Sequence, residues 1–547
     1  MRLPRTTLCA LLLSLASATL SAAQQIRPYE PAFDVGDYAL TIDLPDTGST
    51  IHGNAVLSLT RTAKSDTLSL DLLDLHVNSV TVDGHTVKFV QTTSKVLIPL
   101  AAKRNGATYT VAVDYGGAVT DGLIVRTDTA GRWTYFGDNW PNRARHWIPS
   151  IDHPSDKATV TWRVRAPEGR TVVANGKLVS NKPITVSGAR RIEWVWRESR
   201  RIPVYLMVIA AAPLVEYDVG DTACGLAELQ RCVFQSVYVA PEQKNFLPGP
   251  FARVGEIVEL FANLVGPFPY EKLAHLQSST RFGGMENASA IFYADGGFRR
   301  GTMRDGVVAH ETAHQWFGDA VTEREWPHVW LSEGFATYFA ALWTRAAHGD
   351  SAFRQDMSHI RTTVLNDTIS VTKRPVIDTI ETNLLALLNR NSYEKGGFVL
   401  HMLRKQVGER AFFSALRSYY AKNKHSTALT DDLRAEMERA SKQQLGWFFD
   451  QWLRRPGYPT VTATWRYDST ARMVVVDLAQ GGSFGAFQFP ITVAATDASG
   501  ARTLATGQMS ATGNGGTQVR IPLASPPASV VLDPDVELLA RFQITGP

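Results

Sequence analysis

Hydrophobic and polar residues alternate over most of the chain up to about residue 240. In one such stretch four apolar residues occupy every second position and share one face of an extended strand: Tyr109, Val111, Val113 and Tyr115. Asp83 and Gly84 stand between two groups of valines, as in a tight hairpin turn. The apolar stretch 202–215 is short and contains two prolines, so we expect a buried strand there and not a membrane span. This part is predicted to form a β domain.

The pattern changes to helical spacing after Pro241. Apolar residues then recur three and four positions apart, beginning with Val258, Leu260, Phe261 and Leu264. Such segments continue to Trp452, and alternation returns after the Pro- and Gly-containing stretch 455–459. We therefore predict a multidomain α+β protein with an N-terminal β domain (24–240), an α-rich domain (241–455) and a C-terminal β-sandwich (456–547).

The first 23 residues are typical of a secretory signal peptide. Arg2 and Arg5 precede an apolar run from Leu8 to Leu20, and small residues follow directly before Gln24. A run of this length is a poor membrane anchor. We expect residues 1–23 to be removed, which would leave a secreted or periplasmic protein without a stable membrane anchor.

The overall composition is that of a soluble globular protein. The chain has 547 residues, with 56 Lys and Arg against 52 Asp and Glu and a formal charge of +4. Its basic residues are scattered, so the sequence does not indicate a nucleic-acid partner. We expect a monomer.

Two cysteines remain after the predicted signal peptide, Cys224 and Cys232. An exported protein meets an oxidising compartment, which favours a disulfide that closes this short loop. Two free thiols, or a pair of metal ligands, are the alternatives; no histidine or second cysteine pair lies at zinc-finger spacing.

The strongest chemical pattern lies in the α-rich part. His310, Glu311 and His314 form H-E-x-x-H within a proline-free segment (304–319) that we expect to be helical. A spacing of four places both imidazoles on one helix face, so both can reach one metal ion, and nitrogen ligands favour zinc. Glu333, at the start of a second helical segment (334–347), supplies the third ligand. Glu311 then lies where a general base for a metal-bound water is needed.

Neighbouring segments make this pattern more specific. The stretch 310–319 reads H-E-T-A-H-Q-W-F-G-D and the stretch 326–336 reads W-P-H-V-W-L-S-E-G-F-A. Together they resemble the zinc site of the aminopeptidase N family, the gluzincin peptidases that include leukotriene hydrolase. Gly283-Gly284-Met285-Glu286-Asn287 resembles the exopeptidase motif of this family, and Ser392-Tyr393-Glu394-Lys395-Gly396 resembles the motif with its catalytic tyrosine.

The resemblance implies a saddle-like N-terminal β-sheet domain, a thermolysin-like and mostly helical catalytic domain, and one zinc ion. It implies that the Tyr393 hydroxyl donates to the oxyanion and that Glu286 pairs with the free α-ammonium of a peptide. Gly283 and Gly284 would leave room for the substrate backbone, while Met285 would line the pocket for the first side chain. The implied activity is removal of one amino acid at a time from peptides with a free N-terminus.

The sequence departs from the family at two places near this motif. Trp140 stands where the family commonly has the Gln or Glu that helps to hold the amine, and Asp138 is a candidate to compensate. Ala288 and Ser289 replace the Trp-Gly pair that is common after the motif. Either change can alter the affinity for the amine or the preference for the first side chain.

Two other functions compete with the aminopeptidase hypothesis. One is a zinc hydrolase of a non-peptide substrate such as an epoxide, which would not need a free amine. The other is a catalytically inert secreted peptide-binding protein, which commonly lacks a zinc ligand or the general base; neither is missing in this sequence.

Overall fold

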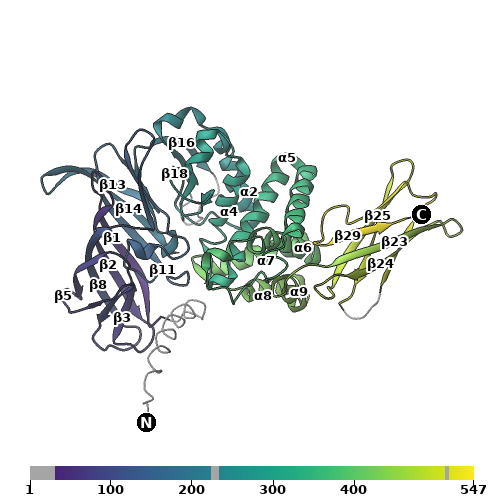
Figure 1. Cartoon of the computed structure of the whole chain (residues 1–547), viewed down its shortest axis with the longest axis horizontal. Coiled ribbons are helices and arrows are strands. Elements are labelled where there is room, and N and C mark those ends of the chain that lie inside the picture. Colours follow the sequence, from purple (N-terminus) through teal and green to yellow (C-terminus); the bar gives the residue numbers. More distant parts are fainter. Residues whose placement is uncertain (1–30, 223–232, 512–515, 547) are drawn as a thin grey trace, which may run out of the picture.

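Three parts follow one another along the long axis of the molecule in the computed structural model: a β-rich N-terminal part, a helical centre and a C-terminal pair of sheets (Figure 1). The structure describes residues 31–222, 233–511 and 516–546. The predicted signal peptide and both cysteines, Cys224 and Cys232, lie outside these residues. Within them, no helix has the length and apolar content needed to cross a bilayer.

The N-terminal part is built on an eight-stranded sheet with the order β13-β14-β11-β1-β2-β8-β4-β5. Its strands are β1 (Phe33–Asp43), β2 (Thr50–Arg61), β4 (His76–Val82), β5 (His85–Thr86), β8 (Thr108–Ala118), β11 (Lys157–Pro167), β13 (Lys177–Val186) and β14 (Ala189–Pro203). Two smaller sheets complete this part, with the orders β3-β7-β6 and β12-β15-β10-β9. Their strands are β3 (Thr67–Asp71), β6 (Val90–Gln91), β7 (Lys95–Pro99), β9 (Leu123–Thr127), β10 (Trp133–Gly137), β12 (Thr171–Ala174) and β15 (Ile209–Ala212).

Local patterns predicted this part well. The four alternating residues of β8 are all buried, and Asp83 and Gly84 form the turn between β4 and β5 with φ angles of 49° and 83°, as a tight hairpin requires. The stretch 202–215 is buried as expected except for Pro213 and Val215, which are half-buried. A short 3₁₀ turn (Val204–Leu206) divides it, so that it contributes the end of β14, all of β15 and the first residue of β16 (Val215–Thr222) instead of one strand.

A five-stranded sheet contains strands from both sides of residue 240. β16 (Val215–Thr222) and β17 (Val233–Val239) join it with β18 (Lys272–Ser278), β20 (Ala290–Ala294) and β19 (Gly284–Met285), in the order β16-β17-β18-β20-β19. β17 pairs in parallel with β18, a contact between strands that α2 separates in the sequence. Alternation alone identifies a strand and not the sheet that it joins, so the pattern did not predict this pairing.

Helices fill the centre of the molecule and enclose the zinc motif. They are α2 (Val254–Val265), α3 (Asp295–Arg300), α4 (Asp305–His314), α5 (Trp330–Asn366), α6 (Gly396–Val407), α7 (Glu409–Asn423), α8 (Thr430–Ser441) and α9 (Gly446–Leu453), with a small parallel pair of strands, β21 (Val321–Glu323) and β22 (Ser426–Ala428). α4 ends at His314, earlier than the expected residue 319. α5 begins at Trp330, before the expected residue 334, and is interrupted at Gly349, where φ is 86°.

The C-terminal part consists of two sheets, as expected for a sandwich. One has the order β27-β24-β23-β29 and the other β26-β25-β28. Their strands are β23 (Thr460–Asp468), β24 (Met473–Gly481), β25 (Phe489–Thr496), β26 (Arg502–Met509), β27 (Thr517–Pro522), β28 (Ser529–Leu532) and β29 (Arg541–Thr545). The first strand begins directly after the predicted Pro- and Gly-containing link.

Candidate metal centre and active site

The three predicted metal ligands converge on one point between α4 and α5. The Nε2 atoms of His310 and His314 are 3.2 Å apart, and each lies 3.4 Å from Oε2 of Glu333. Tetrahedral zinc with bonds of about 2.1 Å separates its ligand atoms by about 3.4 Å, so the three atoms are spaced as zinc requires. Glu333 Oε2 is buried and receives no hydrogen bond, which is the state of a carboxylate oxygen reserved for a cation. The donor set therefore fits zinc.

Neighbouring groups hold two of these ligands in the state that binds a cation. His314 Nδ1 lies 3.2 Å from the carbonyl oxygen of Phe317 and 2.9 Å from Oγ of Ser332. A proton on Nδ1 satisfies the carbonyl and leaves the Nε2 lone pair facing the metal position. Burial opposes ionisation of Glu333, but protonated His314 and His310 lower its pKa to about 2 in the metal-free site, and a bound cation would take over the role of their charge, so this ligand is anionic.

Glu311 is buried beside the ligands, and Gly284 is the residue that makes space for it. A Cβ added to Gly284 would lie 2.1 Å from Glu311 Oε1, which no side chain could accommodate without displacing the carboxylate. The room predicted for substrate at Gly284 is thus occupied by Glu311 itself. Burial raises the pKa of Glu311, and the carboxylates of Glu286 and Glu333 raise it further.

Tyr393 reaches the centre from a single π-helical turn (Asn391–Lys395) that precedes α6. Its ring lies parallel to that of His310, with a centroid distance of 6.1 Å and an interplanar angle of 9°. Burial raises the pKa of the Tyr393 hydroxyl, and Glu333 and Glu286 raise it further, so the hydroxyl remains a hydrogen-bond donor.

Three glycines explain how Tyr393 comes so close, and for two of them, Gly334 and Gly397, no role was predicted from the sequence. A Cβ on Gly334 of α5 would lie 2.9 Å from the backbone of Gly396, and one on Gly397 would lie 3.2 Å from the carbonyl oxygen of Gly334. The absence of side chains lets α5 and α6 approach backbone to backbone. Gly334 in one apolar helical segment and Gly396 and Gly397 in another were the features of the sequence that could have predicted this close approach.

Glu286 directly follows β19, an edge strand of the five-stranded sheet, and faces the same cavity. One ligand atom each from Glu286, Glu311 and His314 lie within 4.8 Å of one another. No Lys or Arg of the described residues forms an ion pair with Glu286, although the side chain is only 6% exposed. Burial raises its pKa because it disfavours the charged form. A cation that enters the cavity and pairs with Glu286 would stabilise the ionised carboxylate.

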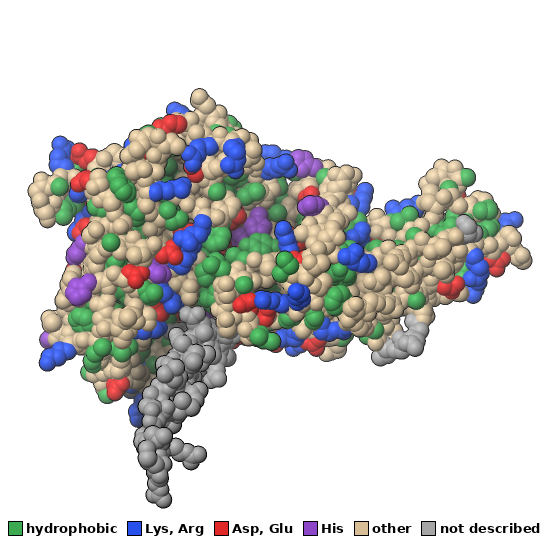
Figure 2. Space-filling model, in the orientation of Figure 1, with side chains coloured by type: hydrophobic (Ala, Val, Ile, Leu, Met, Phe, Trp, Pro, Cys, Tyr) green, Lys and Arg blue, Asp and Glu red, His purple; other side chains and the backbone are tan. Residues whose placement is uncertain are grey.

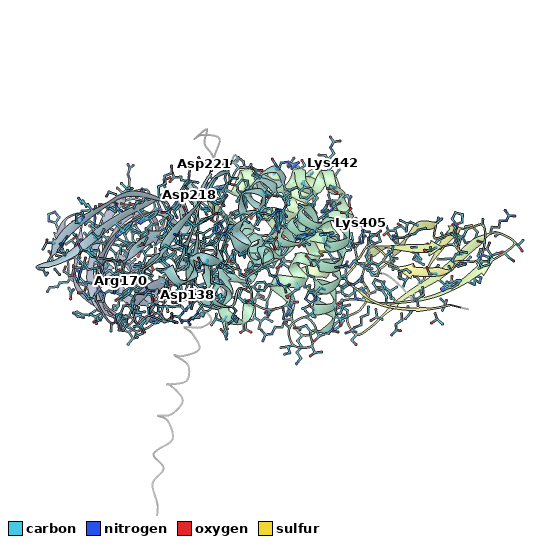
Figure 3. All side chains as sticks on the ribbon, turned by 90° about the horizontal axis from the view of Figure 1, so that it is seen from above. Asp138, Arg170, Asp218, Asp221, Lys405 and Lys442 are labelled. Atoms are coloured by element: carbon cyan, nitrogen blue, oxygen red, sulfur yellow. The ribbon has the colours of Figure 1, made fainter. Side chains whose placement is uncertain are left out.

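Asp138 does not supply a second free carboxylate. It is fully buried where the N-terminal part meets the helical part (Figure 3), and its Oδ2 lies 3.0 Å from Arg143 Nη2 and 3.2 Å from Arg281 Nε. Its other oxygen accepts a hydrogen bond from Thr280 Oγ1 at 3.3 Å. Asp138 is thus paired with groups of the protein itself and does not offer a free carboxylate to an amine.

Trp140 instead gives the cavity an aromatic wall. Its ring meets those of Phe282 and Trp326 edge to face, at centroid distances of 6.2 and 5.4 Å. Together with Met285, Trp140 and Phe282 line a cavity of about 410 Å³ that contains the zinc ligands. On the face of the molecule seen in Figure 2, histidine side chains lie within a hollow between the β-rich and helical parts. The wall beside Glu286 is thus apolar.

Comparisons with known proteins agree with this geometry. The model of the peptidase M1 N-terminal domain matches residues 35–206, and the model of the peptidase family M1 domain matches residues 253–452. Aminopeptidase N of Lactococcus lactis is 26% identical over 81% of this chain and 53% of its own length. Aminopeptidase M1 of Arabidopsis thaliana is 29% identical over 59% of this chain and 37% of its own. The chain thus spans about half the length of the curated relatives it matches, or less.

Solved structures show the same relationship. An M1 zinc metallopeptidase from Deinococcus radiodurans is 25% identical, with a TM-score of 0.68 over 77% of this chain and 94% of that chain. A further structure of the Deinococcus protein contains a Tyr-Ser-Ala substrate. Aminopeptidase A of Legionella pneumophila, 17% identical with a TM-score of 0.80 over 95% of this chain and 60% of that chain, shares the fold. With both M1 models matching in order and the complete zinc-ligand set in place, this chain belongs to the M1 family of zinc peptidases.

Proposed function

We propose that the protein is a zinc-dependent aminopeptidase that hydrolyses the first peptide bond of peptides with a free N-terminus. One observation supports this most directly: the buried carboxylate of Glu286, which forms no ion pair with a Lys or Arg among the described residues, faces the same cavity as the three zinc ligands. A carboxylate at that place recognises a charged chain end, which an internal peptide bond or an epoxide does not offer.

The residues of the site divide the chemistry among them. When bound, zinc polarises the scissile carbonyl and makes water acidic enough to serve as the nucleophile. Glu311 accepts the proton of the attacking water and returns it to the leaving amine. The Tyr393 hydroxyl donates to the carbonyl oxygen as negative charge develops there. Glu286 binds the α-ammonium, so that only the first peptide bond reaches Glu311 and Tyr393.

The walls of the cavity support an apolar or aromatic first residue. Trp140, Phe282 and Met285 offer no charged group to the first side chain, and aromatic rings pack well against one another. The Tyr-Ser-Ala substrate of the Deinococcus relative begins with such a residue. This likeness makes Tyr-Ser-Ala a suitable test peptide.

A comparison of Tyr-Ser-Ala with its N-acetylated form tests the proposal. We expect kcat/KM for the free peptide to exceed that for the acetylated peptide by at least about 100-fold, or about 2.7 kcal/mol, because acetylation leaves the Glu286 carboxylate unpaired. Glu286→Ala should remove most of this preference. Glu256→Gln, on the exposed face of α2, is the control and should retain it. Equal cleavage of both peptides by the wild type would contradict an aminopeptidase.

We also propose that the protein is exported, with a mature N-terminus at Gln24 and a Cys224–Cys232 disulfide, and acts as a monomer. The support is the charged, apolar and small-residue pattern of residues 1–23, since an exported protein meets oxidising conditions. Mass spectrometry of protein from an expressing bacterium should show a chain that begins at Gln24, and both cysteines should be alkylated only after reduction. Light scattering, which measures the molar mass in solution, should give the mass of one chain. A chain that begins at Met1 and stays in the cytoplasm would contradict export.

A further inference from the structure

The side chain of Gln315 connects the zinc helix to the exopeptidase segment. Gln315 directly follows the ligand His314, yet its amide binds the other segment: Nε2 donates to the carbonyl oxygen of Glu286 at 2.8 Å, and Oε1 accepts from the backbone N–H of Ser289 at 2.8 Å. Its second amide hydrogen is donated to Oδ2 of Asp319, also at 2.8 Å. The side chain is fully buried. One amide thus holds both ends of the segment 286–289.

The orientation of this amide follows from its partners. The carbonyl oxygen of Glu286, which lies near Nε2, has no proton to donate, and the group near Oε1 is the backbone N–H of Ser289. A flipped amide would place oxygen against oxygen on one side and N–H against N–H on the other. Only one arrangement satisfies all three partners.

Ser289 is restrained on every side in an unfavourable backbone conformation. Its φ is 62°, in the left-handed region that residues other than glycine rarely adopt. Its carbonyl oxygen accepts hydrogen bonds from Lys272 Nζ at 2.8 Å and from the N–H of Ala274 at 3.0 Å, and its Oγ accepts from the N–H of Gly176 at 2.7 Å. These bonds attach the end of the segment to the sheet and to the N-terminal part, so Gln315 links the helix to a rigid partner.

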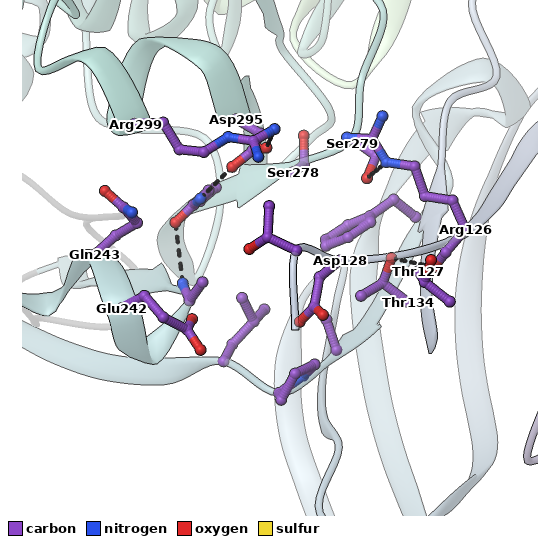
Figure 4. A pocket seen from close by; sticks show the side chains of 17 residues that line it. Arg126, Thr127, Asp128, Thr134, Glu242, Gln243, Ser278, Ser279, Asp295 and Arg299 are labelled. Carbon is purple, nitrogen blue, oxygen red and sulfur yellow. Dashed lines mark hydrogen bonds and ion pairs between the residues drawn. The ribbon is translucent and has the colours of Figure 1, made fainter. Parts of the chain in front are cut away.

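The chain just before the motif 283–287 is anchored as well. Arg126 Nε donates to Ser279 Oγ at 2.7 Å, at the edge of a second cavity of about 240 Å³ between β9, β10 and α3 (Figure 4). Polar and apolar side chains both line this cavity, and Arg299 pairs with Asp295 there. The hydrogen bond from Arg126 thus attaches the chain that leads to Glu286 to β9.

We propose that Gln315 is a positioning residue that sets the separation between Glu286 and the zinc ligands, and so defines a site one residue long. This inference rests on the proposed aminopeptidase function. Gln315 lines neither the cavity nor the metal position and acts through the backbone of Glu286. A shift of the ammonium-binding carboxylate by about 1 Å would misplace the first peptide bond relative to Glu311, and misplacements of that size cost about 100-fold in rate.

Binding and cleavage of Tyr-Ser-Ala test this role in Gln315→Met, which keeps the length of the side chain but lacks the amide. We expect the free-over-acetylated preference in kcat/KM to fall at least about tenfold, mainly through a higher KM, because Glu286 is no longer held in place. The same loss of preference should appear in dissociation constants measured by calorimetry in the inactive Glu311→Gln background. Zinc content should remain one per chain.

Gln451→Met is the matched control. Gln451 is also a buried glutamine whose amide bridges two segments. Its Nε2 donates to the carbonyl oxygen of Gln488 at 2.7 Å, and its Oε1 accepts from the backbone N–H of Gln488 at 2.9 Å. This bridge lies at the C-terminal sandwich, away from the zinc ligands. Gln451→Met should lower the melting temperature similarly and leave the preference unchanged. If Gln315→Met does not fold, the same free-over-acetylated ratio of kcat/KM is measured in Gln315→Glu, which keeps the acceptor for the N–H of Ser289, and the same loss of preference is expected.

The outcomes separate the two proposals. A wild type that does not distinguish free from acetylated peptide overturns the proposed function. A wild type that does, together with a folded, zinc-loaded Gln315 variant that keeps the wild-type preference and KM, overturns the role of Gln315 alone.

Discussion

Glu311→Gln is expected to lower kcat by about a thousandfold or more while one zinc per chain remains bound. Glutamine has the same shape as glutamate but cannot accept a proton, so the attacking water is no longer activated and the leaving amine is not protonated. Because the three ligands come from other residues, the amide should not disturb the metal. Steady-state kinetics with Tyr-Ser-Ala and elemental analysis of the same sample check both halves of this prediction.

Glu323→Gln is the matched control for this change. Glu323 is another buried carboxyl of the catalytic part, 1% exposed, and neither of its oxygens has a hydrogen-bond partner. Burial raises the pKa of Glu323 to about 8, so at neutral pH the group is already uncharged and an amide is a close substitute. Activity close to that of the wild type is expected for Glu323→Gln. Comparable activity in Glu311→Gln would refute the role of Glu311 as general base.

Removal of the metal is expected to abolish hydrolysis and to destabilise the fold. Without a cation, Glu286, Glu311 and Glu333 are buried within a small volume, and the imidazoles offset the repulsion among these acids only in part, since the pKa of Glu311 is still raised by burial and by the other two acids. A cation that binds only the folded chain adds about 4 kcal/mol to the free energy of unfolding at a thousandfold excess over its dissociation constant. The melting temperature should therefore fall after chelation and rise again with zinc.

The choice of added metal provides the control for this experiment. Two imidazole nitrogens and one carboxylate match zinc, whereas calcium and magnesium prefer oxygen ligands and should restore neither activity nor stability. A metal-free sample that hydrolyses Tyr-Ser-Ala at the wild-type rate would show that the site does not use zinc. A stable fold with full metal content but no hydrolysis of any peptide would instead favour the inert binding protein.

The fold was predictable where a pattern is local. Alternation in β8 and the Asp83-Gly84 turn depend on side-chain periodicity and on the few residues that tolerate positive φ, so neighbouring residues were sufficient to predict them. The pairing of β17 with β18 was not predictable in this way, because β18 begins at Lys272, after α2. Sheet membership is a long-range property that periodicity does not contain.

For the site, the sequence by itself determined the chemistry: His310 and His314 must share a helix face because four residues make about one turn, and their residue types select the metal. Tertiary structure alone decided the geometry. The approach of Glu333 depends on the packing of α5 against α4, the commitment of Asp138 depends on Arg281 from a distant segment, and the position of Glu286 depends on a hydrogen bond from Gln315. Each of these contacts joins residues whose separation along the chain carries no information about their distance in space.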